Sequence, residues 1–383
     1  MADAPDQYSG RLVPLKAYPT YGYYEAIMKG LARRYPNRCA LENWGTLPSG
    51  RKILVLRISE NVARTGGKPR LLLTAAMHGD ETAGYAMLLR LAEELLRSSN
   101  PLLRSTEIFI NPLGNPDGAY AGGDHTLARA RRGNANGVDL NRNYPDPDDG
   151  SHPDGNDYQP ETHAFMAAAE RLGFDLAINL HGGAELFNYP WDTYRNRHPD
   201  TRWWQRVSRD FATRAQRASG PARYFTDRHD GVTNGHDWYP IAGSRQDYMN
   251  YYHRAREATA EVTVEKQYPA EKLPTLWRHF SPALLGYLNE ARFGLHGSVH
   301  DARTGRPVRA LVSIPAHDRM NSEVYSDATY GDFHRFLAAG TYRVFVSAEG
   351  YRTRSFLTTI EDGKRAEVSV SLDPLPGVDA RKR

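Results

Sequence analysis

The stretch Leu71-Leu-Leu-Thr-Ala-Ala-Met-His-Gly-Asp-Glu81 decides the fold of this chain. Its apolar part is short and bounded, which is typical of a central strand in a parallel sheet. A second run of this kind, Leu176-Ala-Ile-Asn-Leu180, ends in His181. Because ligands bind at the carboxyl ends of such strands, the sequence predicts that His78, Glu81 and His181 meet at one edge of a sheet.

The residue types at this edge indicate a metal site. Two imidazoles and one carboxylate are a ligand set for Zn²⁺ that leaves a fourth position open, and open sites are catalytic. A His-X-X-Glu pair alone is weak evidence, since about one should arise by chance in a chain with this many His and Glu residues. The predicted strand before each histidine is therefore the stronger evidence, and it favours a metal site over a structural His–Glu pair.

The bulk composition excludes several classes of protein. The chain has 383 residues and is 40% hydrophobic, enough for one large domain and one small one. Its 49 basic and 45 acidic residues are scattered, which argues against a nucleic-acid partner. Cys39 is the only cysteine, so an intrachain disulfide and a multi-thiolate metal site are excluded. No stretch approaches the ~20 apolar residues of a membrane span.

The periodicity of apolar residues predicts alternating helices and strands. Helices are expected over 21–34, 82–96, 161–172, 201–218 and 276–291. Strands are expected over 53–58, 71–77, 108–111, 176–180 and 260–264. This alternation predicts an α/β sheet sandwiched between helices. The intervening segments 111–160 and 219–243 are too long for simple connectors and are expected to build a site.

The pattern changes after Arg292 to short alternating strands separated by turn residues. These are expected over 294–300, 308–314, 333–337, 341–346, 354–359 and 366–372, and they predict a β-sandwich. We therefore expect a first domain over 1–292, a sandwich over 293–374 and a disordered tail over 375–383.

A second dense cluster of polar residues runs from Asn134 to Pro145. Together with Arg132 it offers two guanidinium groups and several amides, which can bind a carboxylate through hydrogen bonds. In isolation, Asn141-Arg-Asn143 would be better interpreted as a turn with a solvated arginine. Beside a His/Glu/His site, we favour substrate binding.

The order and spacing of these motifs resemble the zinc metallocarboxypeptidase family, and specifically its N/E or regulatory subfamily, which trims basic residues from peptide C-termini. The resemblance spans nearly the whole chain. It is carried by residues 78–81, 115–118, 139–143, 159–162, 181–183, 231–235, 238–239 and 261–265.

The resemblance implies a fold and a cofactor. The fold is a mixed central sheet between helices, followed by a small all-β transthyretin-like sandwich. The cofactor is one Zn²⁺ per chain, bound by His78, Glu81 and His181. This ligand set agrees with the one that the strand ends suggest.

The resemblance also implies a general base. Glu261 and Glu265 flank Val262-Thr-Val264, a segment similar to the family's Glu-Ile-Thr-Leu-Glu strand, in which the second glutamate is catalytic. We therefore expect Glu265 to take the proton from water. Both glutamates would share one face of a strand, and Glu265 would lie nearer its carboxyl end. Glu261 is the alternative.

Further roles follow by position. Arg132 matches the arginine that polarises the scissile carbonyl and stabilises its developing negative charge. Asn141 and Arg142 match the clamp on the terminal carboxylate of the substrate. Tyr239 matches the mobile tyrosine that closes over bound substrate, and Asp139 matches the carboxylate that orients a zinc-binding histidine, here His78.

The residue that is removed depends on the floor of the specificity pocket. Asp192 stands where basic-specific members carry an acid, and it should pair with Lys or Arg. Gln246 likewise matches the basic-specific type. Relatives usually read Gly-Gly-Met-Gln-Asp where this chain has Gly243-Ser-Arg-Gln-Asp247, and an inward-pointing Arg245 would neutralise Asp192.

The sequence thus predicts a zinc carboxypeptidase that releases C-terminal Arg or Lys from peptides. One alternative is the same chemistry on acidic or cell-wall peptides, and another is an inactive peptide-binding protein. We expect peptide or protein C-termini as partners, no nucleic acid, no membrane insertion and a monomer. A periplasmic or secreted location is expected, although the chain begins without a signal peptide, which would then have been removed.

Overall fold

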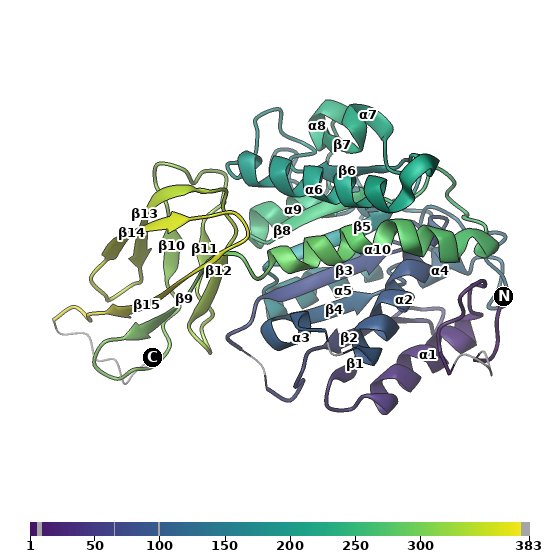
Figure 1. Ribbon diagram of the computed structural model, residues 1–383, viewed down its shortest axis with the longest axis horizontal. Coiled ribbons are helices and arrows are strands. Elements are labelled where there is room, and N and C mark those ends of the chain that lie inside the picture. Colours follow the sequence, from purple (N-terminus) through teal and green to yellow (C-terminus); the bar gives the residue numbers. More distant parts are fainter. Residues whose placement is uncertain (6–9, 65, 99, 377–383) are drawn as a thin grey trace.

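An eight-stranded mixed sheet forms the centre of the first domain (Figure 1). The structure is a computed structural model that describes residues 1–5, 10–64, 66–98 and 100–376. The sheet has the strand order β1-β2-β4-β3-β5-β8-β6-β7, and its four central neighbours β4, β3, β5 and β8 run parallel. The strands are β1 (Cys39–Thr46), β2 (Lys52–Ile58), β3 (Arg70–Ala75), β4 (Glu107–Asn111), β5 (Leu176–His181), β6 (Leu186–Tyr189), β7 (Val232–Asn234) and β8 (Arg256–Glu261). The predicted α/β class with a mixed sheet is confirmed.

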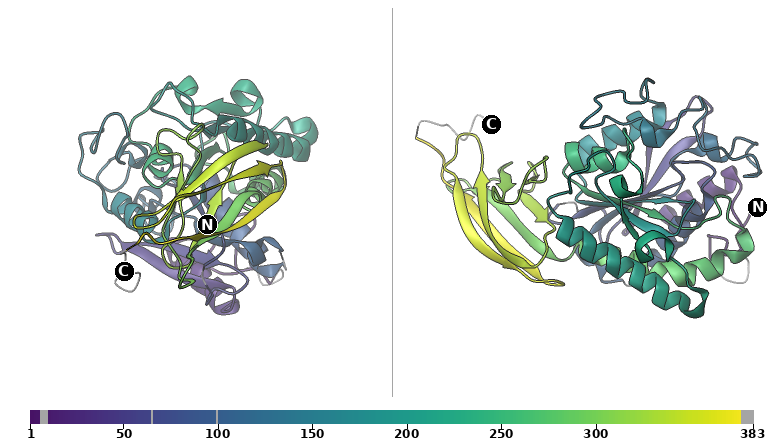
Figure 2. Two further views of the ribbon diagram at one scale, coloured as in Figure 1. Left: turned by 90° about the vertical axis from the view of Figure 1, so that its left-hand side faces the viewer. Right: turned by 90° about the horizontal axis from the view of Figure 1, so that it is seen from above.

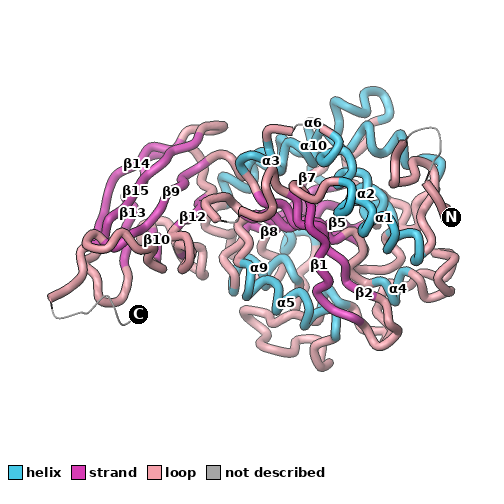
Figure 3. The backbone as a smooth tube through the Cα atoms, turned by 90° about the horizontal axis from the view of Figure 1, so that it is seen from below, coloured by secondary structure: helices cyan, strands magenta, loops and turns pink. Residues whose placement is uncertain are grey.

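Helices cover both faces of this sheet (Figure 3). Four long helices pack on one face in the largest apolar cluster: α1 (Tyr21–Arg34), α2 (Thr82–Arg97), α6 (Thr201–Ser219) and α10 (Leu273–Glu290). Two helices pack on the other face in a second cluster: α5 (Pro160–Leu172) and α9 (Arg245–Tyr252). The short helices are α3 (Leu102–Ser105), α4 (Pro116–Ala119), α7 (Asp227–Asp230) and α8 (Gly235–Trp238). No helix among the described residues is long and apolar enough to span a bilayer.

A separate β-sandwich follows α10 and lies beside the first domain (Figure 2). Its two sheets have the orders β11-β10-β13-β14 and β12-β9-β15, and they enclose an apolar core of their own. The strands are β9 (Gly294–Asp301), β10 (Leu311–Ser313), β11 (Val324–Tyr325), β12 (Asp332–Arg335), β13 (Gly340–Ser347), β14 (Arg354–Ile360) and β15 (Arg365–Leu372). The boundary expected at residue 292 falls between α10 and β9. Most of the expected tail, from residue 377 on, lies outside the described residues.

One strand prediction was wrong in a way that matters for the site. The last strand of the sheet was expected over 260–264, but β8 spans Arg256–Glu261. Its sequence, Arg-Glu-Ala-Thr-Ala-Glu, has no large apolar side chain, yet all six residues are buried. Apolar patterning selected the valines that follow, which lie beyond the strand in a turn where Gly183 N donates to Thr263 O.

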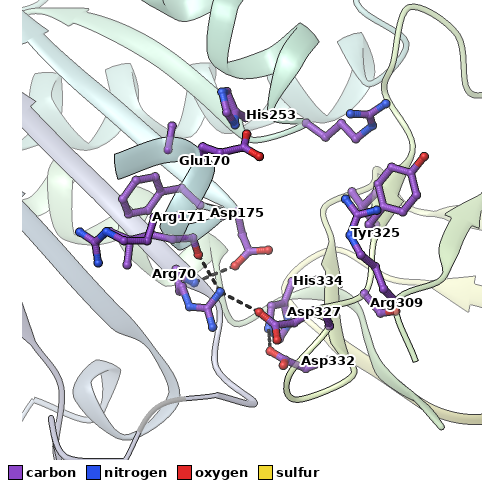
Figure 4. Close-up of a pocket in the computed structure, with 18 of the residues that line it drawn as sticks. Arg70, Glu170, Arg171, Asp175, His253, Arg309, Tyr325, Asp327, Asp332 and His334 are labelled. Carbon is purple, nitrogen blue, oxygen red and sulfur yellow. Dashed lines mark hydrogen bonds and ion pairs between the residues drawn. The ribbon is translucent and has the colours of Figure 1, made fainter. Parts of the chain in front are cut away.

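Buried charges join the two domains. Asp200, just before α6, accepts hydrogen bonds from Arg256 of β8 at 2.8 Å and from His317 of the sandwich at 2.7 Å. Arg335 of β12 lies 3.3 Å from the same carboxylate, and both arginines are almost fully buried. At the neighbouring interdomain pocket, Arg70 of β3 reaches Asp327 of the sandwich at 3.1 Å (Figure 4). The sandwich is therefore tied to the first residue of β8.

Substituting Asp200→Asn should destabilise the chain strongly. The change would leave two buried arginines without their shared carboxylate, and breaking a buried ion pair costs about 3–5 kcal/mol. Asp373→Asn is a matched control, because its pair with Arg354 is about half exposed and worth at most about 1 kcal/mol. Urea unfolding measures both free energies. Equal, small changes for the two variants would contradict a stabilising role for the interdomain charges.

Candidate active site

Three buried side chains converge at the carboxyl ends of β3 and β5. His78 and Glu81 lie in the turn between β3 and α2, and His181 is the last residue of β5. His78 Nδ1 lies 3.0 Å from Glu81 Oε1, and His181 Nδ1 lies 2.9 Å from Glu81 Oε2. The two Nδ1 atoms are 3.1 Å apart. The structure thus brings together the three predicted ligands, with one donor atom from each within 4.8 Å of the others.

The surroundings of these side chains fit a metal ion. Glu81 is held as a carboxylate, because the two imidazoles outweigh its burial and keep its pKa well below the usual range. Burial lowers the pKa of His181 to about 4, so its imidazole is neutral, as a metal ligand must be. His78 Nε2 lies 2.9 Å from Asp139 Oδ1. A carboxylate that accepts the second ring proton fixes the orientation of a metal-binding histidine.

Arg132 lies against the same cluster. Its Nε donates to Asp139 Oδ2 at 2.9 Å, and its Nη1 lies 3.4 Å from Glu81 Oε1. Burial opposes ionisation of Asp139, but His78 and Arg132 outweigh it and lower the pKa of that carboxyl. The guanidinium is therefore fixed beside the predicted metal ligands, where it can act on an oxygen of a bound substrate.

Glu261 is the carboxyl group that lines the pocket beside the three predicted metal ligands. It is the last residue of β8 and pairs in register with His181 on the neighbouring strand. Its side chain lines the same pocket, and its buried Oε2 has no hydrogen-bond partner among the described residues. Burial, with the nearby charge of Glu81, raises the pKa of Glu261 to about 8. A carboxyl group in this state would be ionised readily by a divalent cation at its side.

Glu265 occupies a different place from the one predicted. Its side chain is about half exposed, and its carboxylate pairs with Lys272 at 3.3 Å. It does not line the pocket that contains the metal ligands. The expected geometry required β8 to continue to residue 265, but the strand ends at Glu261, so the later glutamate does not reach the carboxyl edge of the sheet.

The pocket over the cluster has a volume of about 170 Å³. One wall contains the predicted substrate-binding residues Asn141, Arg142 and Tyr239. Asn141 Oδ1 accepts from the backbone N of Arg245 at 3.0 Å, which leaves its amide NH₂ to donate to a ligand. Tyr239 is 47% exposed at the end of α8, consistent with a side chain that can move. No role was predicted from the sequence for Trp238 and Lys266, which also line the pocket.

A group of buried oxygens lies behind this wall. Asp192 Oδ1 accepts from Asn188 Nδ2 at 3.2 Å and from Gln246 Nε2 at 3.0 Å. The carbonyl oxygens of both amides are buried with no hydrogen-bond partner among the described residues. A Cβ on Gly235 would lie 1.9 Å from Asp192 Oδ1, so only glycine fits there. The structure thus brings the two predicted residues Asp192 and Gln246 into contact. Asn188 also contacts Asp192, and the sequence did not predict a role for it.

Burial raises the pKa of Asp192, against hydrogen bonds from Ser244 and Asn188 and the charge of Arg142. Asp247 accepts from the backbone N of Asp192 at 3.0 Å, and burial together with the charge of Asp192 raises the pKa of Asp247 well above its usual value. Arg245 is turned away, because its Nε donates to Glu257 at 2.9 Å. It therefore does not neutralise Asp192. The unpartnered oxygens are acceptors that suit an ammonium or guanidinium group.

Two histidines and one carboxylate beside a buried glutamate and an arginine define a metal-dependent hydrolase of the His₂Glu type. The sequence matches the zinc carboxypeptidase family over residues 24–282, so the chain belongs to that family. It is a zinc-dependent peptide hydrolase that acts on peptide C-termini. The family resemblance predicted from the sequence is confirmed.

Individual relatives agree with this assignment. Carboxypeptidase M of Mus musculus is 31% identical, with 92% of this chain and 83% of that protein aligned. Carboxypeptidase D of Homo sapiens is 32% identical over 91% of this chain, but the chain spans only 26% of that protein. The solved carboxypeptidase A from Helicoverpa armigera has a TM-score of 0.62 and 19% identity, covering 74% of this chain and 77% of its own. At that identity it shows the fold alone.

Proposed function

We propose that this enzyme releases Arg or Lys from the C-terminus of peptides, with Glu261 as the general base. The observation that carries the specificity is the buried acceptor group of Asp192, Asn188 and Gln246, in which two carbonyl oxygens have no hydrogen-bond partner among the described residues. An apolar terminal side chain would leave these oxygens unsatisfied, which costs about 1–3 kcal/mol for each group. An acidic one would be repelled by Asp192.

The other residues have complementary roles in the proposal. His78, Glu81 and His181 bind Zn²⁺, which supplies an activated water and polarises the scissile carbonyl. Glu261 accepts a proton from the attacking water and returns it to the leaving amine. Arg132 stabilises the negative charge on the carbonyl oxygen, while Asn141 and Arg142 hold the terminal carboxylate.

Tyr239 closes over the substrate and excludes water from the site. Asp139 holds His78 in the orientation that the metal requires. The periplasmic or secreted location and the monomeric state stay predictions.

A panel of peptides that differ only in their last residue tests the proposal. Peptides ending in Arg and Lys should be cleaved with kcat/KM at least about 100-fold above those ending in Phe or Glu, since the buried acid is paired only by a basic side chain. A chelator should abolish activity, and added Zn²⁺ should restore it. Preference for Phe or Glu would overturn the proposed specificity, and no cleavage of any peptide would favour a peptide-binding protein.

A further inference from the structure

Lys266 is a cation at the mouth of the pocket with no role in the proposed chemistry. It follows β8 by five residues, and its side chain is 40% exposed. Its Nζ lies 3.1 Å from Glu81 Oε1 and 3.9 Å from Asp80 Oδ2. A Cβ on Gly183 would lie 3.7 Å from Lys266 Cε and 4.0 Å from Glu261 Oε2. The lysine stem therefore runs along the pocket wall beside the proposed base.

The direction in which a peptide binds determines which of its residues would meet Lys266. The clamp of Asn141 and Arg142 and the acceptor group of Asp192 hold the last residue of the substrate on one side of the metal ligands. The peptide must then extend away from that side, with its scissile carbonyl between Arg132 and Glu261. Lys266 lines the same pocket as Asn141 and Arg142, and it contacts the turn that carries Asp80 and Glu81. A peptide whose last residue is held by the clamp would pass this turn with the residue before the scissile bond.

The charge that Lys266 presents there depends on its neighbours. Glu81 is a metal ligand, so a bound divalent cation takes up its negative charge. Asp80 remains, at the longer distance of 3.9 Å and 21% exposed. Arg132 lines the same pocket, but its charge is paired with Asp139 at 2.9 Å. Lys266 is then the partly exposed cation that the side chain of the penultimate residue would meet, in contrast to the acidic group that receives the terminal residue.

We propose that Lys266 makes the subsite for the penultimate residue selective for acidic side chains and unfavourable to basic ones. The preferred substrates are then peptides ending in Glu-Arg, Asp-Arg or the corresponding Lys pairs, whereas a run of basic residues is trimmed slowly. This inference rests on the proposed function, because it takes the direction of the peptide from the clamp and the specificity pocket.

Three peptides that end in Glu-Arg, Ala-Arg and Lys-Arg, and are otherwise identical, test the inference. In the wild-type enzyme kcat/KM for Glu-Arg should exceed that for Lys-Arg about tenfold, from attraction of one side chain and repulsion of the other at a partly exposed cation. In Lys266→Met the ratio should fall to about two or less. The ratio compares two substrates on one variant, so it is insensitive to any loss of overall activity.

Two controls separate the subsite from general effects of charge. Lys272→Met removes a cation from the same segment that is paired with Glu265 outside the pocket, and it should leave the ratio as in the wild type. Raising the salt concentration should lower the wild-type ratio, since charges near solvent are screened. A wild-type ratio near one, or the same ratio in Lys266→Met as in the wild type, would overturn the inference.

A binding measurement keeps this test separate from the proposed function. If the zinc-loaded enzyme cleaves none of the three peptides, the proposed function fails, and the dissociation constants of the same peptides for wild type and Lys266→Met are compared. Tighter binding of Glu-Arg that is lost in the variant would support the subsite, and equal binding of Glu-Arg and Lys-Arg would overturn it.

Discussion

Replacing Glu261 by Gln is expected to lower kcat for peptide hydrolysis by about 10³-fold, because a positioned general base contributes on the order of 10² to 10⁴ to the rate. Gln has nearly the same shape but cannot accept the proton from water at neutral pH. Glu265→Gln is the matched control. Its side chain is exposed and paired with Lys272, so its loss should change kcat by less than about twofold.

The two variants must be compared at equal metal content. Both should bind one zinc per chain, since neither glutamate is among the ligands, and metal analysis of the purified proteins checks this. The reverse result, with Glu265→Gln inactive and Glu261→Gln active, would show that the segment after β8 rearranges when metal or substrate binds. It would return the role of base to the residue that the sequence pattern favoured.

The difference between the predicted base, Glu265, and the proposed one, Glu261, has a definite origin in the sequence. The spacing Glu-X-Thr-X-Glu occurs twice in succession, as residues 257–261 and as residues 261–265. Apolar patterning favoured the second copy, because it contains two valines where the first has two alanines. The first copy is the strand β8, and the sheet around it supplies the burial that its small side chains do not signal. Glu261 ends the first copy and begins the second, so the spacing alone fits either glutamate as the base.

The convergence of His78, Glu81 and His181 could be predicted because its signal lies in two short stretches of sequence. Each histidine follows an apolar strand, and the parallel sheet brings the two strand ends to one edge. Asn188 and Lys266 gave no such signal. Their positions depend on contacts with residues far along the chain, such as the bond from Asn188 to Asp192 and the approach of Lys266 to Glu81. Such contacts can be identified only from the folded structure.

The direction of the Arg245 side chain likewise depends on a contact made in the folded chain, with Glu257. The sequence placed this arginine next to Gln246 in the specificity pocket and left its direction open. The structure turns it toward Glu257, where both side chains are almost fully buried. Glu257 therefore holds this cation away from Asp192.

Asp192→Asn should reduce kcat/KM for Arg- and Lys-terminated peptides by about 100-fold or more. The carboxylate is 3% exposed, so the charge of the substrate would be buried without its partner, a loss of about 3–5 kcal/mol. Turnover of an Ala-terminated peptide, which should be slow in the wild type, should change little, because its side chain does not pair with Asp192. The ratio of kcat/KM between Arg and Ala substrates measures the effect free of any change in zinc binding.

The control Asp237→Asn removes an exposed acid of the neighbouring helix α8, which pairs with Arg197, and this substitution should leave the ratio intact. If Asp192→Asn lowers kcat/KM equally for Arg and Ala substrates, the acid supports the pocket wall and does not select the basic residue.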